Sequence, residues 1–234
     1  MDTAEPNFSQ FGISEEEGEK LVAEVIRYIL FKTHQNSGCP IKRDELTQLI
    51  TKNYHNRSLP ALVLSKATSK LSTVFGYDMK ELQRARPSST NQARSSQSSA
   101  DSKSYIITSQ LDSGVYRKHV DDPRKSHLTG LTFVVLGIVN LAGGKITEES
   151  LWHHLARLGL SQDDEKNTEF GSTKQALETL VQQRYLQKDK SNGPEGLTLY
   201  YELAERGLQA TASSSFKESI TQMVMSEATT IELD

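Results

Sequence analysis

Hydrophobic residues recur in pairs near the start of the chain, at a spacing typical of an amphipathic helix. Between Leu21 and Leu30 they fall three and four positions apart, which places them on one stripe of a helix of about four turns. Ser14 and Glu17 have the spacing of a capping box just before this stripe, and Ser37-Gly38 is a stop signal after it. The pattern predicts a first helix with one apolar face and one solvated face.

Two further helices are expected to follow the first. Residues 40–42 form a short extended link, and a second helix begins near Arg43. Ser58 is a candidate cap for a third helix that has Pro60 in its first turn. The positions expected to face inward on this third helix are Leu64, Ala67, Leu71, Val74 and Phe75. This order is how a winged-helix unit begins, and its third helix is the one presented to a DNA groove.

A hairpin with a long tip is expected next. Residues 77–86 and 104–110 change to an extended pattern, and a serine-rich tract lies between them. The tract, 87–103, has little to bury, so we expect a disordered wing loop. Such a loop either follows a phosphate backbone or serves as a phosphorylatable linker.

The second half of the chain repeats this order. Residues 128–142 are apolar on almost every side, which predicts a helix that is buried nearly all round. Two glycines end that helix, a short extended link follows, and Thr147 is a candidate cap for the next helix. A third helix is expected over about 172–186, and a hairpin that ends near Leu203 closes the unit.

The repeated order predicts a mainly α fold with small β-hairpin wings, built as a tandem winged helix. The expected divisions are a disordered acidic N-terminus (1–14), winged-helix unit A (15–111), a linker (112–126), winged-helix unit B (127–210), and a C-terminal helix with an acidic tail (211–234). Apolar residues of that last helix either pack back on unit B or dock a partner.

The composition is that of a soluble globular protein, with 35% hydrophobic and 24% charged residues. Its longest apolar run, 131–142, is shorter than the roughly 20 residues of a membrane span. Polar and acidic residues follow Met1, so a secretory signal is not expected. The single cysteine, Cys39, excludes a disulfide framework and favours a reducing compartment.

Charge is distributed unevenly along the chain. Residues 1–19 carry six acids and no base, whereas residues 20–126 carry 18 bases against 9 acids. Residues 127–210 carry 8 bases against 11 acids. A basic first half suggests an anionic partner such as nucleic acid, although a solvated lysine surface explains it equally well.

No convergent set of catalytic side chains is evident. Cys39 has no identifiable histidine partner, and the adjacent His153 and His154 point about 100 degrees apart on a helix, so they cannot chelate one ion. Gly143-Gly144-Lys145 lacks the first glycine and the final Ser or Thr of a phosphate-binding loop. We therefore expect no enzyme activity, no catalytic residues, no cofactor and no metal site.

Several multi-residue motifs between Leu21 and Ala210 resemble the MAGE homology domain, a tandem winged-helix fold. In chain order they are YILFKTHQ, PIKRDELTQLI, LSKATSKLSTVFGYDMKEL, VVLGIVNLAGGKITEESLWHHLARLGL, FGSTKQALETLVQQRYLQK and LYYELAERGLQA. Within this family the chain most resembles the MAGE-like non-SMC element subunits of Smc five/six complexes, with vertebrate MAGE paralogues as the alternative. It departs from the family in the serine-rich insertion, and in residues 204–207, which replace the usual Trp-Gly-Pro.

The resemblance implies a non-enzymatic, nuclear and chromosome-associated scaffold for DNA repair and recombination. Family members bind a RING-type ubiquitin ligase through the first winged-helix unit, where a pair of adjacent leucines is important; Ile29 and Leu30 occupy those positions here. These two residues are equally well explained as plain core. The complex subunit also binds a kleisin through the second unit, for which the candidate residues are Leu180, Tyr185 and Leu186.

Double-stranded DNA, bound without sequence specificity, is the third partner that the resemblance implies. The candidate contacts are Lys42, Arg43, Lys66, Lys70, Lys174, Arg184, Lys188 and Lys190. Regulation of another RING ligase and sequence-specific transcription regulation are the alternatives. The motif SKATSK on the third helix offers few long side chains for base edges, which disfavours the transcription regulator.

Overall fold

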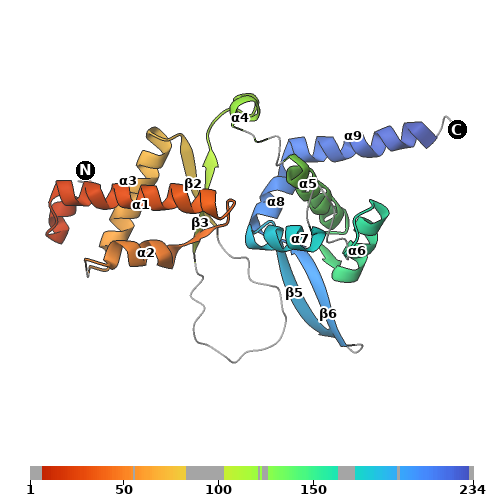
Figure 1. Cartoon of the computed structure of the whole chain (residues 1–234), viewed down its shortest axis with the longest axis horizontal. Coiled ribbons are helices and arrows are strands. Elements are labelled where there is room, and N and C mark those ends of the chain that lie inside the picture. Colours follow the sequence, from red (N-terminus) through yellow and green to blue (C-terminus); the bar gives the residue numbers. More distant parts are fainter. Residues whose placement is uncertain are drawn as a thin grey trace, which may run out of the picture. The chain divides into compact units, whose positions relative to one another are not determined.

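The structure is a computed structural model of the 234-residue chain. It describes residues 7–54, 56–82, 103–120, 122, 126–162, 172–193 and 196–231, and only the backbone over 224–231. The serine-rich tract expected as a wing loop lies outside the described residues, except for Lys103. The chain forms two compact units, Met1–Asp121 and Asp122–Asp234 (Figure 1).

The first unit consists of helices around a three-stranded antiparallel sheet of order β1-β3-β2. Its elements are η1 (Phe8–Phe11), α1 (Glu15–Gln35), β1 (Ile41–Lys42), α2 (Arg43–Thr51), α3 (Leu59–Thr73), β2 (Tyr77–Leu82), β3 (Ser104–Ser109) and α4 (Ser113–His119). The link expected at 40–42 does pair with the hairpin, since Ile41 lies opposite Tyr105. This unit is a winged helix.

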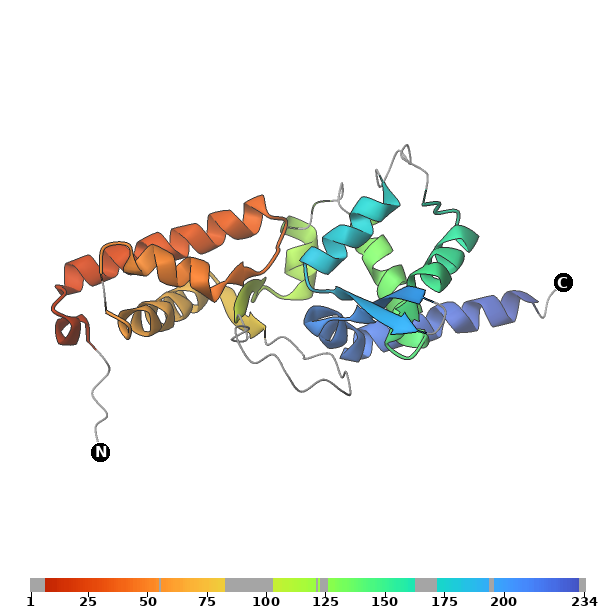
Figure 2. The ribbon, with the colours of Figure 1, turned by 90° about the horizontal axis from the view of Figure 1, so that it is seen from below.

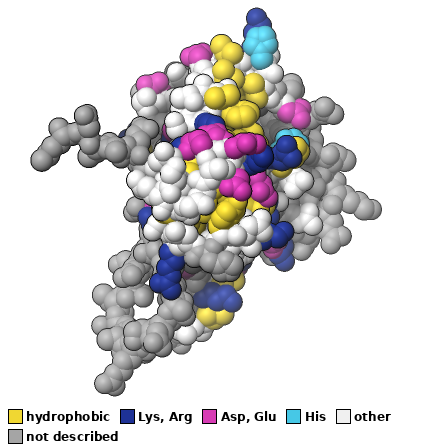
Figure 3. All heavy atoms as spheres, turned by 90° about the vertical axis from the view of Figure 1, so that its left-hand side faces the viewer, with side chains coloured by type: hydrophobic (Ala, Val, Ile, Leu, Met, Phe, Trp, Pro, Cys, Tyr) yellow, Lys and Arg dark blue, Asp and Glu magenta, His cyan; other side chains and the backbone are white. Residues whose placement is uncertain are grey.

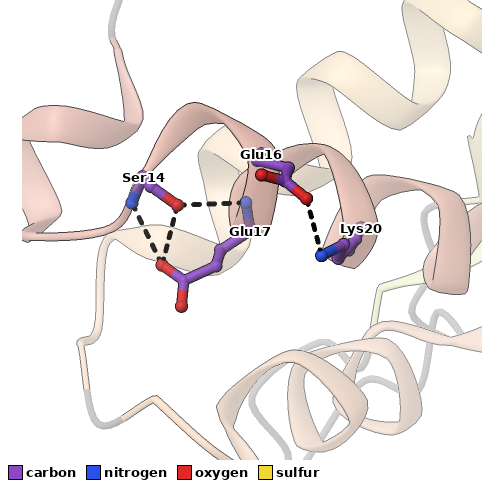
Figure 4. A network of polar contacts seen from close by, with 4 residues as sticks. All are labelled: Ser14, Glu16, Glu17 and Lys20. Atoms are coloured by element: carbon purple, nitrogen blue, oxygen red, sulfur yellow. Dashed lines mark hydrogen bonds and ion pairs between the residues drawn. The ribbon is translucent and has the colours of Figure 1, made fainter.

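The capping box predicted at Ser14 is confirmed. The Glu17 backbone N–H donates to the Ser14 hydroxyl at 3.3 Å, and the Ser14 N–H donates to the Glu17 carboxylate at 3.2 Å (Figure 4). Because these bonds satisfy amides at the first turn, α1 begins at Glu15 and presents its predicted stripe to the core. Val22, Val25 and Ile29 are at most 1% exposed.

The folded part of the chain begins within the N-terminal segment 1–14, which was expected to be disordered. Residues 7–14 belong to the fold, because Phe8 of η1 is completely buried against Gly18 of α1. A Cβ atom on Gly18 would lie 2.2 Å from the Phe8 ring, so the absence of a side chain there makes room for the ring.

The end of α3 also differs from the prediction. The helix ends at Thr73, Gly76 takes the expected left-handed conformation (φ 66°), and Val74 and Phe75 are 69% and 47% exposed. These two side chains were expected to face inward and instead lie at the surface. The segment expected as a linker contains the short helix α4, in which no residue is buried.

The second unit repeats the architecture with a sheet of order β4-β6-β5. Figure 2 shows the ribbon of the chain from below. Its elements are α5 (Ser126–Leu141), β4 (Lys145–Thr147), α6 (Glu148–Arg157), α7 (Thr173–Gln182), β5 (Leu186–Gly193), β6 (Gly196–Leu203), α8 (Glu205–Ala212) and α9 (Ser214–Ile231). Thr147 caps α6 as predicted, because its hydroxyl accepts from the Ser150 N–H at 3.1 Å. The tandem winged-helix fold is confirmed.

Two helices of the second unit differ from their predictions. Leu131, Val135 and Val139 of α5 are buried, but Leu141 is 69% exposed, so the helix is not buried all round. The third helix, α7, ends at Gln182 rather than near 186 because Arg184 adopts a left-handed conformation (φ 62°). That turn redirects the chain into β5.

The C-terminal segment packs on the second unit. Phe216 of α9 is 7% exposed, and its ring centroid lies 4.7 Å from that of Phe133 on α5. Over its first turns α9 therefore belongs to this core rather than to an independent tail. In the part of the chain that is described, no helix is both long and apolar enough to cross a membrane.

Candidate protein-binding site

The first unit has an apolar hollow of about 530 Å³ between α1 and α3, here called the α1–α3 hollow. It is lined by Glu19, Ala23, Ile26, Arg27, Leu30, Phe31, Lys70, Val74 and Phe75. Phe31 is 64% exposed, and with Val74 and Phe75 it forms a cluster of large apolar side chains in contact with solvent. Figure 3 shows a band of hydrophobic side chains on one face of the molecule, crossed by acidic and basic ones. Such clusters are typical of protein interaction sites.

The adjacent pair Ile29 and Leu30 is divided between the core and this hollow. Ile29 is 1% exposed and packs in the core, whereas Leu30 is partly buried and lines the hollow. Neighbouring residues on a helix point about 100 degrees apart, so only one of the two reaches the surface. The structure does not test the predicted ligase contact, but it leaves Leu30 as the accessible member.

Acidic residues of α1 reach across to lysines of α3 beside the hollow. Glu17 is held by the cap and Glu16 pairs with Lys20 at 2.9 Å (Figure 4). Glu15 and Glu19 pair instead with lysines of α3. The acidic first turn of α1 therefore serves both its own helix and its neighbour.

Lys66 and Lys70, two predicted DNA contacts, are the lysines of α3 that these acids neutralise. The Lys66 ammonium lies 2.9 Å from the Glu15 carboxylate and 4.4 Å from the centroid of the Phe8 ring. Lys70 pairs with Glu19. The face of α3 that a winged helix commonly presents to DNA thus carries lysines already paired with acids.

A second hollow lies between α5 and α7, and one of the three residues predicted to bind a kleisin lines it. This α5–α7 hollow measures about 250 Å³ and is lined by Leu128, Leu131, Thr132, Gln175, Ala176, Thr179, Leu180 and Gln183. Leu180 lines it but is only 4% exposed. Leu186 is fully buried and does not line this hollow, and its predicted kleisin contact stays a prediction.

Tyr185 is held by Arg206 at the turn into α8. The Arg206 guanidinium lies 4.3 Å from the Tyr185 ring centroid and donates to its hydroxyl at 3.0 Å. Arg184 makes two bonds to Glu205, at 3.0 and 2.7 Å. These contacts fix the turn into α8.

The remaining predicted cations differ in whether an acid neutralises them. Lys188 lies 2.7 Å from Glu148 and 5.1 Å from the centroid of the Tyr201 ring. Burial raises the pKa of Tyr201, and the nearby Lys188 ammonium lowers it in part. Within the described residues, Lys42, Lys174 and Lys190 form no ion pair, and Arg43 is half-buried beside Tyr105.

The described residues contain no group of three or more His, Cys, Asp or Glu side chains placed to hold a metal ion. The His153 and His154 rings lie 6.0 Å apart between centroids, in an edge-to-face arrangement that does not converge on one point. What the geometry offers is surface for binding macromolecules.

Sequence reasoning missed the exposed end of α3 and the environment of Trp152. Val74 and Phe75 continue the apolar spacing of α3, so periodicity alone places them in the core. The available signal was Gly76, whose left-handed turn breaks that spacing just after them. The Trp152 indole nitrogen is buried and has no hydrogen-bond partner within the part of the chain that the structure describes, which no sequence pattern indicates.

Two helical units, each with its own three-stranded sheet and hairpin wing, define a tandem winged-helix protein. The family model of the MAGE homology domain matches residues 25–212, so the chain belongs to the MAGE homology domain family. It is 25% identical to human Melanoma-associated antigen 8 over 205 residues, which cover 88% of this chain and 58% of that protein. It is 29% identical over 170 residues to the mouse Non-structural maintenance of chromosomes element 3 homolog, covering 72% and 53% of the two.

Among solved structures, a chain of the Nse1-Nse3-Nse4 complex has the same fold. The TM-score is 0.74 at 23% identity, over 91% of this chain and 93% of that chain. This chain spans between about half and three fifths of the length of the two relatives above.

Proposed function

We propose that this protein is a non-enzymatic scaffold subunit of a chromosome-maintenance and DNA-repair complex of the Smc five/six type. In this role it binds a RING-type ubiquitin ligase subunit through the first unit and a kleisin subunit through the second, and it contacts double-stranded DNA in the nucleus. Its support is the family membership, the likeness to a Non-structural maintenance of chromosomes element 3 homolog, and the shared fold with a chain of the Nse1-Nse3-Nse4 complex.

The observation that carries the proposal is the α1–α3 hollow. Leu30, Phe31 and Val74 leave apolar surface in water, and covering such surface stabilises a complex by roughly 25 cal/mol per Å² before the costs of association. The charged side chains at its edge, Arg27 and Lys70 with Glu19, provide a polar rim around this apolar centre. An apolar centre with a polar rim is the usual organisation of a protein interface.

Co-expression of the chain with candidate ligase and kleisin subunits tests the two protein contacts separately. Val74→Asp places a charge at the α1–α3 hollow and is expected to abolish co-purification of the ligase but not of the kleisin. Leu128→Asp, at the α5–α7 hollow, is expected to do the reverse. Leu158→Asp is the matched control, because Leu158 is 58% exposed and lines neither hollow. Retention of the ligase by Val74→Asp overturns the first contact.

For DNA, the cations without acid partners are the stronger candidates. A phosphate must displace a carboxylate to reach Lys66 or Lys70, whereas Lys42 and Lys190 are exposed and unpaired within the described residues. We expect weak, sequence-indifferent binding that falls steeply with salt, reduced more by Lys42→Glu than by Lys66→Glu. A gel-shift series with duplex DNA measures this, and absence of any shift at low ionic strength overturns the DNA contact.

The regulator of another RING ligase is the second candidate, because Melanoma-associated antigen 8 matches 88% of this chain. Identification of the ligase that co-purifies from a nuclear extract separates the two. The transcription regulator loses support from the pairing of Lys66 and Lys70 with acids, since these lysines lie on the helix that would read bases.

A further inference from the structure

The wing of the second unit has a strand edge that is only partly paired. β5 pairs with β6 along its whole length, from Gly196 to Leu203, whereas β4 pairs with Tyr200, Tyr201 and Glu202 alone. After Thr147 the chain of β4 turns into α6. In the described sheet, residues 196–199 of β6 therefore have a strand neighbour on one side only.

The backbone groups of Leu197 face this open edge. The Leu203 N–H donates to the Gly144 carbonyl at 3.0 Å, which shows that Leu203 directs its backbone groups toward β4. In an antiparallel sheet this direction alternates, so Tyr201 and Leu199 face the same side, and so does Leu197, beyond the end of β4. No described strand pairs with its N–H and C=O, which leaves them available to another chain.

A hollow of about 500 Å³ lies beside this edge, between α6 and β6, and is here called the β6 hollow. It is lined by Thr147, Glu148, Glu149, Trp152, Gln162, Leu197, Thr198 and Leu199. Leu197 is 60% exposed, and the Trp152 indole N–H is buried with no acceptor among the described residues. An unsatisfied buried donor is costly, and a ligand that supplies an oxygen acceptor there removes that cost.

We propose that the β6 hollow binds an extended peptide segment of a partner protein by strand addition to the open edge of β6. The segment pairs with the Leu197 backbone and places alternate apolar side chains against Leu197 and Leu199. One of its backbone or side-chain oxygens accepts the Trp152 N–H. Glu149, exposed at the mouth of the hollow, favours a segment that carries Lys or Arg. This site is separate from the two hollows proposed above for the ligase and the kleisin.

The test is selection of peptides from a random 12-residue display library on the full chain, followed by titration of the selected peptides. We expect enriched sequences with alternating apolar residues and at least one base. Leu197→Pro removes the open-edge N–H, and proline is tolerated at a strand edge, so affinity should fall at least about tenfold. Asn192→Pro is the matched control, because Asn192 lies opposite Leu197 and directs its backbone to the other edge of the hairpin.

Trp152 provides a second readout that does not depend on the proline variants. It is the only tryptophan of the chain, so its indole N–H gives one assignable resonance. Bound peptide should shift that resonance and protect the Leu197 amide from exchange, and Trp152→Phe should weaken binding several-fold. The proposal is overturned if the Leu197 amide is protected without peptide, if Asn192→Pro weakens binding as much as Leu197→Pro, if no peptide is enriched, or if duplex DNA and not peptide shifts Trp152.

Discussion

The first helices of the two winged-helix units share four buried positions at identical intervals, but the units cover these helices differently. The shared positions are Leu21, Val25, Ile26 and Ile29 on α1, and Leu131, Val135, Leu136 and Val139 on α5. When the two helices are aligned on these buried positions, Ala23 and Arg27 of α1 correspond to Phe133 and Gly137 of α5. Phe133 and Gly137 contact Phe216 and Ile220 of α9, whereas Ala23 and Arg27 line the α1–α3 hollow.

The second unit shows that this face of the fold can bind a helix. In the second unit α9 supplies that helix with an aromatic anchor, and the glycine at 137 lets Ile220 approach closely. In the first unit the described residues leave the same face open. For the ligase contact proposed above, we therefore expect an amphipathic helix of the partner to enter the α1–α3 hollow.

The largest expected loss of stability is that of a substitution at Gly207, where two backbone segments of the second unit lie close together. A Cβ atom there would lie 2.2 Å from the Tyr185 carbonyl oxygen, a backbone atom, and 3.3 Å from Leu136. Because the backbone cannot yield easily, Gly207→Ala should lower the stability of the second unit by about 3 kcal/mol. Unfolding followed by the fluorescence of Trp152, the only tryptophan, reports on this unit.

Gly18→Ala in the first unit is the control for that substitution. Its Cβ atom would meet a ring atom of Phe8 at the same 2.2 Å, but Phe8 is carried by the short helix η1, which can shift. A loss of about 1 kcal/mol is expected, seen by circular dichroism and not in the Trp152 transition. A Trp152 transition of Gly207→Ala that matches the unchanged chain would contradict the close approach.

Phe216→Ala should convert the covered face of the second unit into an open one. Phe216 is 7% exposed and packs on Phe133, so its loss should cost about 3 kcal/mol and raise the binding of a hydrophobic dye. Met223→Ala, on the same helix but 55% exposed, should change stability by less than about 0.5 kcal/mol. Equal effects of the two would mean that α9 does not anchor through Phe216.

The sequence predicts the two units that are compared here, but not the surface that differs between them. The periodicity of residues 21–30, the cap at Ser14 and the repeated element order predicted both units, because burial and hydrogen bonding are local consequences of spacing. The α1–α3 hollow was not predicted, since Val74 and Phe75 keep an apolar spacing after the helix has ended. Surface exposure depends on where a chain turns and on what another element covers.

The ion pairs could not be predicted from the sequence either. Lys66 and Glu15 are 51 positions apart, so only the packing of α1 on α3 reveals that they neutralise each other. The basic balance of the first half therefore overstates the positive charge available on α3. The same holds for Arg184, whose partner Glu205 lies on the far side of the hairpin in sequence.

Val74→Asp should leave the free protein almost as stable as before, in contrast to Phe216→Ala. Val74 is 69% exposed, so little buried surface is lost and the change should stay within about 0.5 kcal/mol. Hydrophobic dye binding should fall. Chemical denaturation measures the stability, and a loss above about 2 kcal/mol would show that this face is core, which would remove the contrast between the two units.

A small effect is also expected from the ion pair that links α1 to α3. The Lys66 and Glu15 side chains are 29% and 54% exposed, so their pair contributes about 0.5 kcal/mol, and the contact of Lys66 with Phe8 adds a similar amount. Lys66→Ala should therefore lower the stability of the first unit by about 1 kcal/mol at low salt and by less at high salt. Lys20→Ala, whose pair with Glu16 is 72% and 81% exposed, should cost less than half as much. Denaturation by urea at low and high ionic strength measures both, and a salt-independent loss would assign Lys66 to packing on Phe8 alone.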